Sequence, residues 1–193
     1  MKFKLSAFLI ALLLLTACSV KESLQERFKT DIDSFTGAYN NADWEKVTSM
    51  MYPKLFTVTS KEELINTLKS LDSSGMKTQI KVNSIDSVSP EEISGEEKFV
   101  LINYSTSLQI ELMGGLLDKK ELLKAGFESQ FGAGKVKFDE AKNIFTIAAK
   151  QKMIAVTPKD KNDWKYIEHD TTQGDYITRM ILPEEIIKKF EGK

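Results

Sequence analysis

The chain has 193 residues, of which 41% are hydrophobic and 28% are charged, and its 27 Lys and Arg residues nearly balance its 28 Asp and Glu residues. Nucleic-acid binding needs a concentrated basic surface, which this balance does not supply, so we expect no nucleic-acid partner. Cys18 is the single cysteine, which excludes an intramolecular disulfide framework and leaves the hydrophobic core to stabilise the fold.

The N-terminal segment has the organisation of a secretory signal. Lys2 and Lys4 precede an apolar stretch over residues 5–17 that only Ser6 and Thr16 interrupt. A membrane-spanning helix needs about 20 apolar residues, which is more than this stretch offers. We therefore expect residues 1–17 to be a signal peptide that is removed after export.

The residues around Cys18 carry a second signal. Leu15, Thr16 and Ala17 lead into this cysteine, and the pattern resembles the lipobox of bacterial lipoproteins. The resemblance implies cleavage before Cys18, attachment of a diacylglycerol to its thiol, and acylation of the new amino terminus with a chain such as palmitate. Several acyl chains together anchor a protein stably. The resemblance also implies that a residue other than aspartate after the lipidated cysteine, here Ser19, favours the outer membrane if the cell has two membranes. The alternative is an ordinary buried cysteine.

Three helices are predicted after a short tether over residues 18–23. Apolar side chains at steps of three and four give the first helix one buried face, made of Leu24, Phe28, Ile32, Phe35 and Tyr39. A shorter helix begins near Trp44 and is stopped by Pro53. A third begins at Ser60, which has capping-box spacing to Glu63.

From Met76 onward the hydrophobic period changes from about 3.6 to about 2, which indicates strands. Residues 98–112 alternate apolar and polar side chains and predict a long strand with one solvent-facing side. The stretch 79–88 shifts phase between Val82 and Ile85, which predicts a β-bulge that bends the sheet. Further strands are expected over residues 145–155, 164–169 and 176–182.

Two more helices complete the prediction. Residues 117–131 indicate an amphipathic helix that Asp118 caps and Gly132 ends. The helix is a candidate lid over a cavity or a candidate docking face for another protein, or it simply covers one end of the sheet. Its apolar face consists of Leu123, Phe127 and Phe131. Pro183 opens a short C-terminal helix.

Helices followed by an antiparallel sheet, with a helix returning at the end, predict an α+β fold in a single domain over residues 24–193. Three stretches, "AYNNADWEKVTSMMYPKLF", "DWKYIEHD" and "ILPEEIIKKF", resemble the pattern of the nuclear-transport-factor-2-like, or cystatin-like, superfamily. The resemblance implies N-terminal helices packed in a strongly curved antiparallel sheet, forming a cone with a cavity at its mouth. The helix near residues 117–131 is extra relative to the simplest members.

Aromatic residues on the predicted strands are the candidate pocket lining. Tyr104, Trp164 and Tyr166 each carry a polar tip, although such residues also serve as core. His169 is the only histidine and completes this candidate set. The resemblance also implies an isomerase or dehydratase alternative, with His169, Asp170 or Asp175 as general base. Adjacent strand residues face opposite sides, so Asp170 is poorly placed to orient the imidazole, and we assign no catalytic residue.

Other motifs are incomplete. "FGAGKV" lacks the first glycine of a phosphate-binding loop, and Val136 stands where that loop has Ser or Thr. No serine lies in a G-x-S-x-G elbow. A single histidine, with no cysteine left free after lipidation, makes no zinc cluster. We expect neither a metal nor a cofactor.

The leading hypothesis is a non-catalytic, lipid-anchored protein of the bacterial envelope that binds a small apolar ligand or a protein partner through the cone. The first alternative is the isomerase-like enzyme. The second is a structural subunit of an envelope assembly, which predicts a flat apolar patch on the 117–131 helix in place of a deep cavity. Each hypothesis has the membrane as a partner, through lipid on Cys18.

Overall fold

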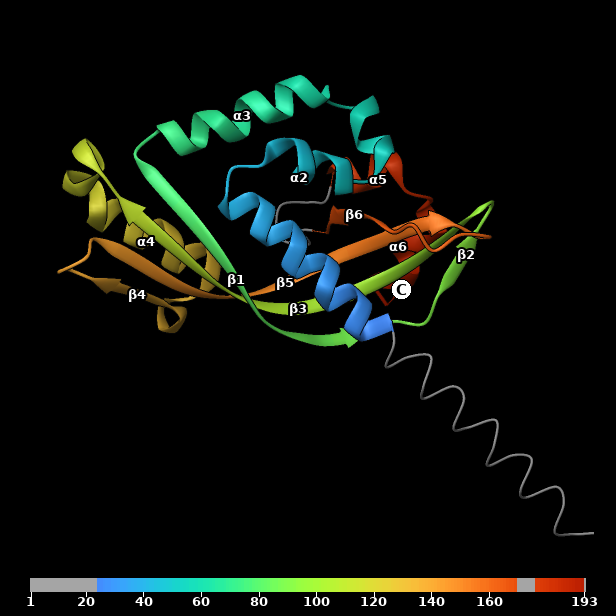
Figure 1. The fold of residues 1–193 in the computed structure, drawn as a ribbon. Coiled ribbons are helices and arrows are strands. Elements are labelled where there is room, and N and C mark those ends of the chain that lie inside the picture. The colour runs from blue at the N-terminus through green and yellow to red at the C-terminus, as the bar shows by residue number, and fades with distance from the viewer. Residues whose placement is uncertain (1–23, 170–175, 193) are drawn as a thin grey trace, which may run out of the picture.

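The computed structural model describes residues 24–169 and 176–192 (Figure 1). The helices are an N-terminal helix over residues 24–40, α2 (Trp44–Met50), η1 (Pro53–Thr57), α3 (Lys61–Ser73), η2 (Gly114–Lys119), α4 (Lys120–Phe131), η3 (Ala133–Lys135), α5 (Tyr176–Ile181) and α6 (Glu184–Phe190). The strands are β1 (Met76–Val88), β2 (Glu92–Ser94), β3 (Glu97–Leu112), β4 (Val136–Asp139), β5 (Ile144–Pro158) and β6 (Lys165–Glu168). The predicted α+β class with a strongly curled antiparallel sheet is confirmed. The predicted signal peptide and tether, with Cys18, lie outside the described residues.

One antiparallel sheet in the order β1-β3-β5-β4 runs through the molecule, with β2 paired to β3 and β6 paired to β5. β3 and β5 pair along almost their whole length. The register of β1 against β3 shifts between Val82 and Ser84 and again between Ile85 and Ser87, so the predicted bulge is confirmed. Bulges bend a strand and increase its twist, which curls this sheet around its contents.

The N-terminal helix lies across the concave face of the sheet (Figure 1). Phe28 is fully buried there, and its ring meets Trp164 and Tyr166 edge-on with centroids 5.2 and 6.4 Å away. Ile32, one helical turn later, is also buried against the same cluster. This inner core attaches the first half of the helix to the sheet.

The predicted solvent-facing side of the long strand holds from Asn103 to Glu111, but the outer face of the sheet is covered before this stretch. Over residues 99–102, β3 is buried on both faces. The cause is a second core outside the sheet, where Phe99 and Leu101 pack with Ile154 of β5 and with Ile186 and Ile187 of α6. The alternating pattern of the rest of β3 holds where no helix covers its outer face.

The strand expected over residues 176–182 is also wrong, since this segment forms helix α5. Its buried residues are Thr178, Ile181 and Leu182, which recur at helical rather than alternating spacing. Ile181 and Leu182 belong to the outer core. The short helix therefore places Ile181 and Leu182 against the sheet. A strand in this place would have needed a free edge of the sheet for pairing.

At the far end of the sheet, α4 packs on a third cluster. Phe127 meets Phe145 of β5 edge-on, with ring centroids 5.2 Å apart, and Leu123 and Phe131 are half-buried beside it. Gly132 ends the helix with a positive φ of 98°, as predicted. The helix begins after a 3₁₀ turn at Lys120, so Asp118 does not cap it.

The outer core yields a stability prediction. Ile186 is fully buried, so Ile186→Ala removes apolar contacts and leaves a cavity, at an expected cost of about 2–5 kcal/mol in the free energy of unfolding. Ile93 is 62% exposed on β2, and Ile93→Ala should cost less than about 1 kcal/mol. Urea unfolding compares the two variants. Equal, small losses would contradict the presence of a packed core outside the sheet.

Candidate ligand pocket

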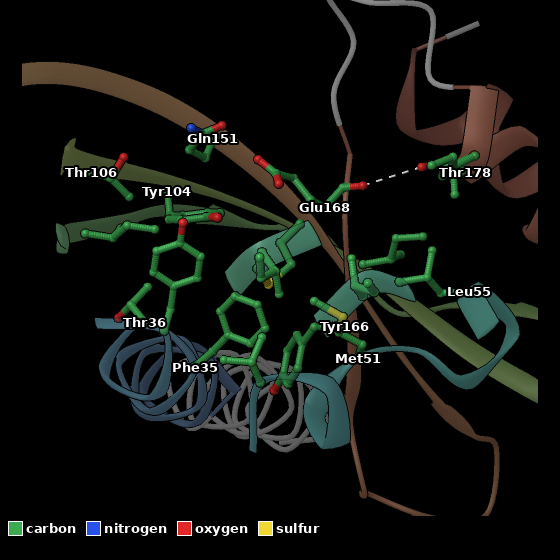
Figure 2. A pocket seen from close by; sticks show the side chains of 18 of the residues that line it. Phe35, Thr36, Met51, Leu55, Tyr104, Thr106, Gln151, Tyr166, Glu168 and Thr178 are labelled. Carbon is green, nitrogen blue, oxygen red and sulfur yellow. Dashed lines mark hydrogen bonds between the residues drawn. The ribbon is translucent and has the colours of Figure 1, made fainter. Parts of the chain in front are cut away.

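A pocket of about 640 Å³ lies between the second half of the N-terminal helix and the concave face of the sheet. Helices α2, α3 and α5 complete its walls (Figure 2). Tyr176 and Ile177 of α5 are exposed and also line the pocket, so the pocket opens to solvent beside this helix.

The walls are mainly apolar. The apolar lining includes Phe35, Val47, Met51, Leu55, Leu64, Leu68, Leu108 and Met153. Several of these side chains, such as Leu64 and Leu68 of α3, are only half-buried although they face the interior of the fold. A ligand that covered them would remove further apolar surface from water, which is the main favourable term in binding.

Asn40 holds the end of the N-terminal helix beside β1. Its side-chain amide donates to the Ile80 carbonyl, and the Ile80 amide donates to the Asn40 side-chain oxygen, each at 2.8 Å. Tyr39 stacks edge-on with Trp44 at 5.3 Å, which ties the same helix end to α2. The helix is thus attached at this end through its own polar and aromatic residues, and the pocket occupies the space between it and the central strands.

One end of the pocket is polar. Figure 2 shows the side chains of Tyr104, Gln151 and Glu168 converging there from β3, β5 and β6. Burial raises the pKa of Tyr104, and the negative charge of Glu168 raises it further, so the phenol stays protonated at neutral pH. Thr178 of α5 donates to the backbone carbonyl of Glu168 at 3.4 Å, which ties α5 to this end of the pocket.

The sequence-predicted lining residues divide into two groups. Tyr104 and Tyr166 line the pocket. The Tyr166 hydroxyl donates to Asp31 at 2.5 Å, and burial together with this carboxylate raises the pKa of Tyr166. Trp164 lies in the inner core against Phe28 and does not line the pocket.

His169 does not line this pocket, but it lies next to it, because the hollow that it borders shares Tyr104, Gln151 and Glu168 with the pocket. It is buried, with 2% of its surface exposed, and it borders a second hollow of about 370 Å³ together with Lys150 and Lys152. Asp170 and Asp175, the other candidates for a general base, lie outside the described residues. The carboxylate that does line the pocket is Glu168, which the sequence analysis missed. Its spacing of two from Tyr166 along β6 is the signal that would have placed it on the same face.

Two classes of feature are absent from the described part of the chain. No helix within residues 24–169 and 176–192 combines the length and the apolar character needed to cross a membrane. In the same residues, no group of three or more His, Cys, Asp or Glu side chains is placed to hold a metal ion.

Thr106 gives the pocket wall a polar atom without a partner. Its hydroxyl is buried and makes no hydrogen bond with any described residue, and Thr157 outside the pocket is in the same situation. A buried unsatisfied hydroxyl costs about 1–3 kcal/mol. We expect Thr106→Val and Thr157→Val each to raise the free energy of unfolding by about 1 kcal/mol.

Urea unfolding measures both threonine variants, with Thr48→Val as the control. Thr48 is equally buried, but its hydroxyl donates to the Trp44 carbonyl at 2.8 Å, so its removal should bring no gain. A loss of stability in Thr106→Val larger than in Thr48→Val would show that the Thr106 hydroxyl has a partner.

Comparisons with known proteins assign no family to the chain. No protein-family model matches the sequence, and no curated protein matches it significantly. A crystal structure of the intermembrane-space region of the chloroplast protein ARC6 is similar over 75% of this chain and 92% of that chain, with 11% sequence identity and a TM-score of 0.42. A likeness at this level carries no functional conclusion.

Proposed function

We propose that this chain is a lipid-anchored protein of the bacterial envelope whose nuclear-transport-factor-2-like domain binds a small apolar ligand in the pocket. The observation that carries the proposal is the apolar pocket of about 640 Å³ between the N-terminal helix and the curled sheet. Small-molecule sites have volumes of about 300–1,000 Å³, mostly apolar walls and a few convergent polar groups, and this pocket has each of these properties.

The pocket favours a ligand with a flexible hydrocarbon part. Met51 and Met153 line it with unbranched thioether side chains, which adapt to the shape of a ligand. Burying one methylene group contributes about 0.8 kcal/mol, which is about a fourfold gain in affinity. Affinity should therefore rise by about this factor for each added methylene until the chain fills the pocket.

The other hypotheses have less support among the described residues. The isomerase hypothesis named His169, Asp170 or Asp175 as general base; His169 does not line the pocket, and Asp170 and Asp175 lie outside the described residues. The docking and assembly hypotheses require an apolar face on α4 that is not covered by the rest of the chain. Leu123, Phe127 and Phe131 instead pack on the sheet. The large apolar residue of α4 that is strongly exposed is Leu122, at 74%.

A pocket-filling substitution tests the ligand site. Leu64→Trp adds bulk to a half-buried wall residue of α3, so it should weaken binding of the neutral fluorescent probe N-phenyl-1-naphthylamine at least ~10-fold because the added ring occupies the site. Leu122→Trp adds the same ring to the exposed side of α4 and should leave binding unchanged. Fluorescence titration measures both. Equal affinity in the two variants would contradict binding in this pocket.

The membrane anchor has its own test. Cys18→Ala removes the thiol to which the diacylglycerol would be attached, so cells fed labelled palmitate should no longer incorporate label into the protein. Ser19→Ala leaves the thiol in place and should incorporate label like the unaltered chain. Label retained by Cys18→Ala would overturn the anchor without bearing on the pocket.

A further inference from the structure

Helix α5 carries apolar side chains on its outer side as well as on the side that packs on the domain. We propose that the outer side of α5 docks on a lipid bilayer, so that the pocket opens toward the membrane that holds the proposed anchor. The inference rests on the proposed function and deepens it by naming the partner that lies at the opening of the pocket.

The inner side of α5 attaches the helix to the domain. Ile181 is buried with Leu182 in the outer core, and the Thr178 hydroxyl donates to the Glu168 carbonyl at 3.4 Å. These contacts determine which side of the helix is turned away from the protein, because successive residues of a helix point in fixed directions. The side turned away carries Tyr176, Ile177 and Met180.

These three residues form the rim patch. The exposed fractions of Tyr176, Ile177 and Met180 are 73, 44 and 53%. Arg179 is the one charged residue of α5, and its guanidinium is paired with Glu191. A helix at a protein surface usually carries polar residues on its outer side, whereas a cluster of exposed apolar residues marks an interaction site. We therefore expect the rim patch to be covered when the protein is in place.

The rim patch is continuous with the pocket, since Tyr176 and Ile177 also line it. Helix η1, which contacts α5, contributes Leu55 to the pocket lining and is capped by Val58, a further exposed apolar residue. A bilayer at this rim would cover the apolar side chains and let a hydrocarbon ligand enter without crossing water. Neither a second copy of the chain nor a protein partner would offer the ligand this route.

The predicted tether keeps the domain at the bilayer, because residues 18–23 span at most about 20 Å when fully extended. The start of the N-terminal helix and α5 both lie in the right half of Figure 1, whereas α4 lies on the left. Near that start, Phe28 contacts Trp164, and from there β6 leads to the Glu168 carbonyl that accepts from Thr178. The tether therefore joins the domain on the side that carries the rim patch.

The test places one nitrobenzoxadiazole fluorophore on the full, lipidated chain in vesicles of phosphatidylethanolamine and phosphatidylglycerol. Cys18 is the single cysteine and would be blocked by lipid, so Met180→Cys supplies one labelling site. Leu122→Cys is the matched control, because Leu122 is also apolar and exposed but lies on α4. Spin-labelled acyl chains should quench the label at position 180 at least ~3-fold more strongly than at position 122, because a docked apolar surface enters the acyl boundary.

Equal quenching at the two positions, or stronger quenching at position 122, would overturn docking through the rim patch while leaving the anchor and the pocket intact. Weak quenching at both positions, together with self-quenching of the label at position 180, would assign the rim patch to a second copy of the chain and also overturn the inference. Failure of the unlabelled chain to float with the vesicles would instead contradict the proposed anchor, and the inference would fall with it.

Discussion

The packing of the N-terminal helix against a curled sheet is the constraint on which the rest of the structure depends. The bulged strand β1 bends the sheet, and the bend gives the helix a concave surface to lie on. Phe28 and Ile32 bury the first half of the helix in contact with that surface. Asn40 pairs its side chain with Ile80 at the other end, so the helix is held at two places. The pocket is the space that this attachment leaves beside the central strands.

At one end of the sheet, β3 and β5 are covered by a packed layer on each face. This arrangement explains how the sheet can keep a cavity open. Phe99 and Leu101 point to the outer core formed with α6, while Val100 and Ile102 point to the inner core. Burial on both faces stabilises β3 and β5 independently of what fills the pocket. The apolar side chains around the cavity can therefore stay partly uncovered without loss of the fold.

Local signals of the sequence predicted local structure well. The capping box at the start of α3 is confirmed by two backbone bonds: Glu63 N–H donates to the Ser60 hydroxyl, and Ser60 N–H donates to the Glu63 carboxylate. The bulge in β1 and the end of α4 at Gly132 are also confirmed, because phase shifts and glycines act within a few residues. The helical periodicity in the first part of the chain and the long alternating strands after it together made the α+β class predictable.

Features that depend on distant partners were not predictable in this way. The six residues of α5 fit either a strand or a helix by pattern, and the outer core that decides between them comes from strands far earlier in the chain. Asn40 binds the backbone of Ile80, which is 40 positions away, so no local signal indicated that it holds the end of the helix. For the candidate site, strand alternation placed Tyr104 and Tyr166, and the same alternation along β6 would have placed Glu168 on the face of Tyr166.

The central claim is that the space between the N-terminal helix and the sheet receives an apolar ligand, and the methionine residues can report on it directly. Met51 and Met153 line the pocket, whereas Met76 packs at the α4 end of the sheet and Met113 is 42% exposed. With methionine methyl groups labelled with ¹³C, NMR spectra should show the signals of Met51 and Met153 shifting when N-phenyl-1-naphthylamine is added, while those of Met76 and Met113 stay in place. Shifts confined to Met76 and Met113, or no shifts at saturating probe, would contradict the claim.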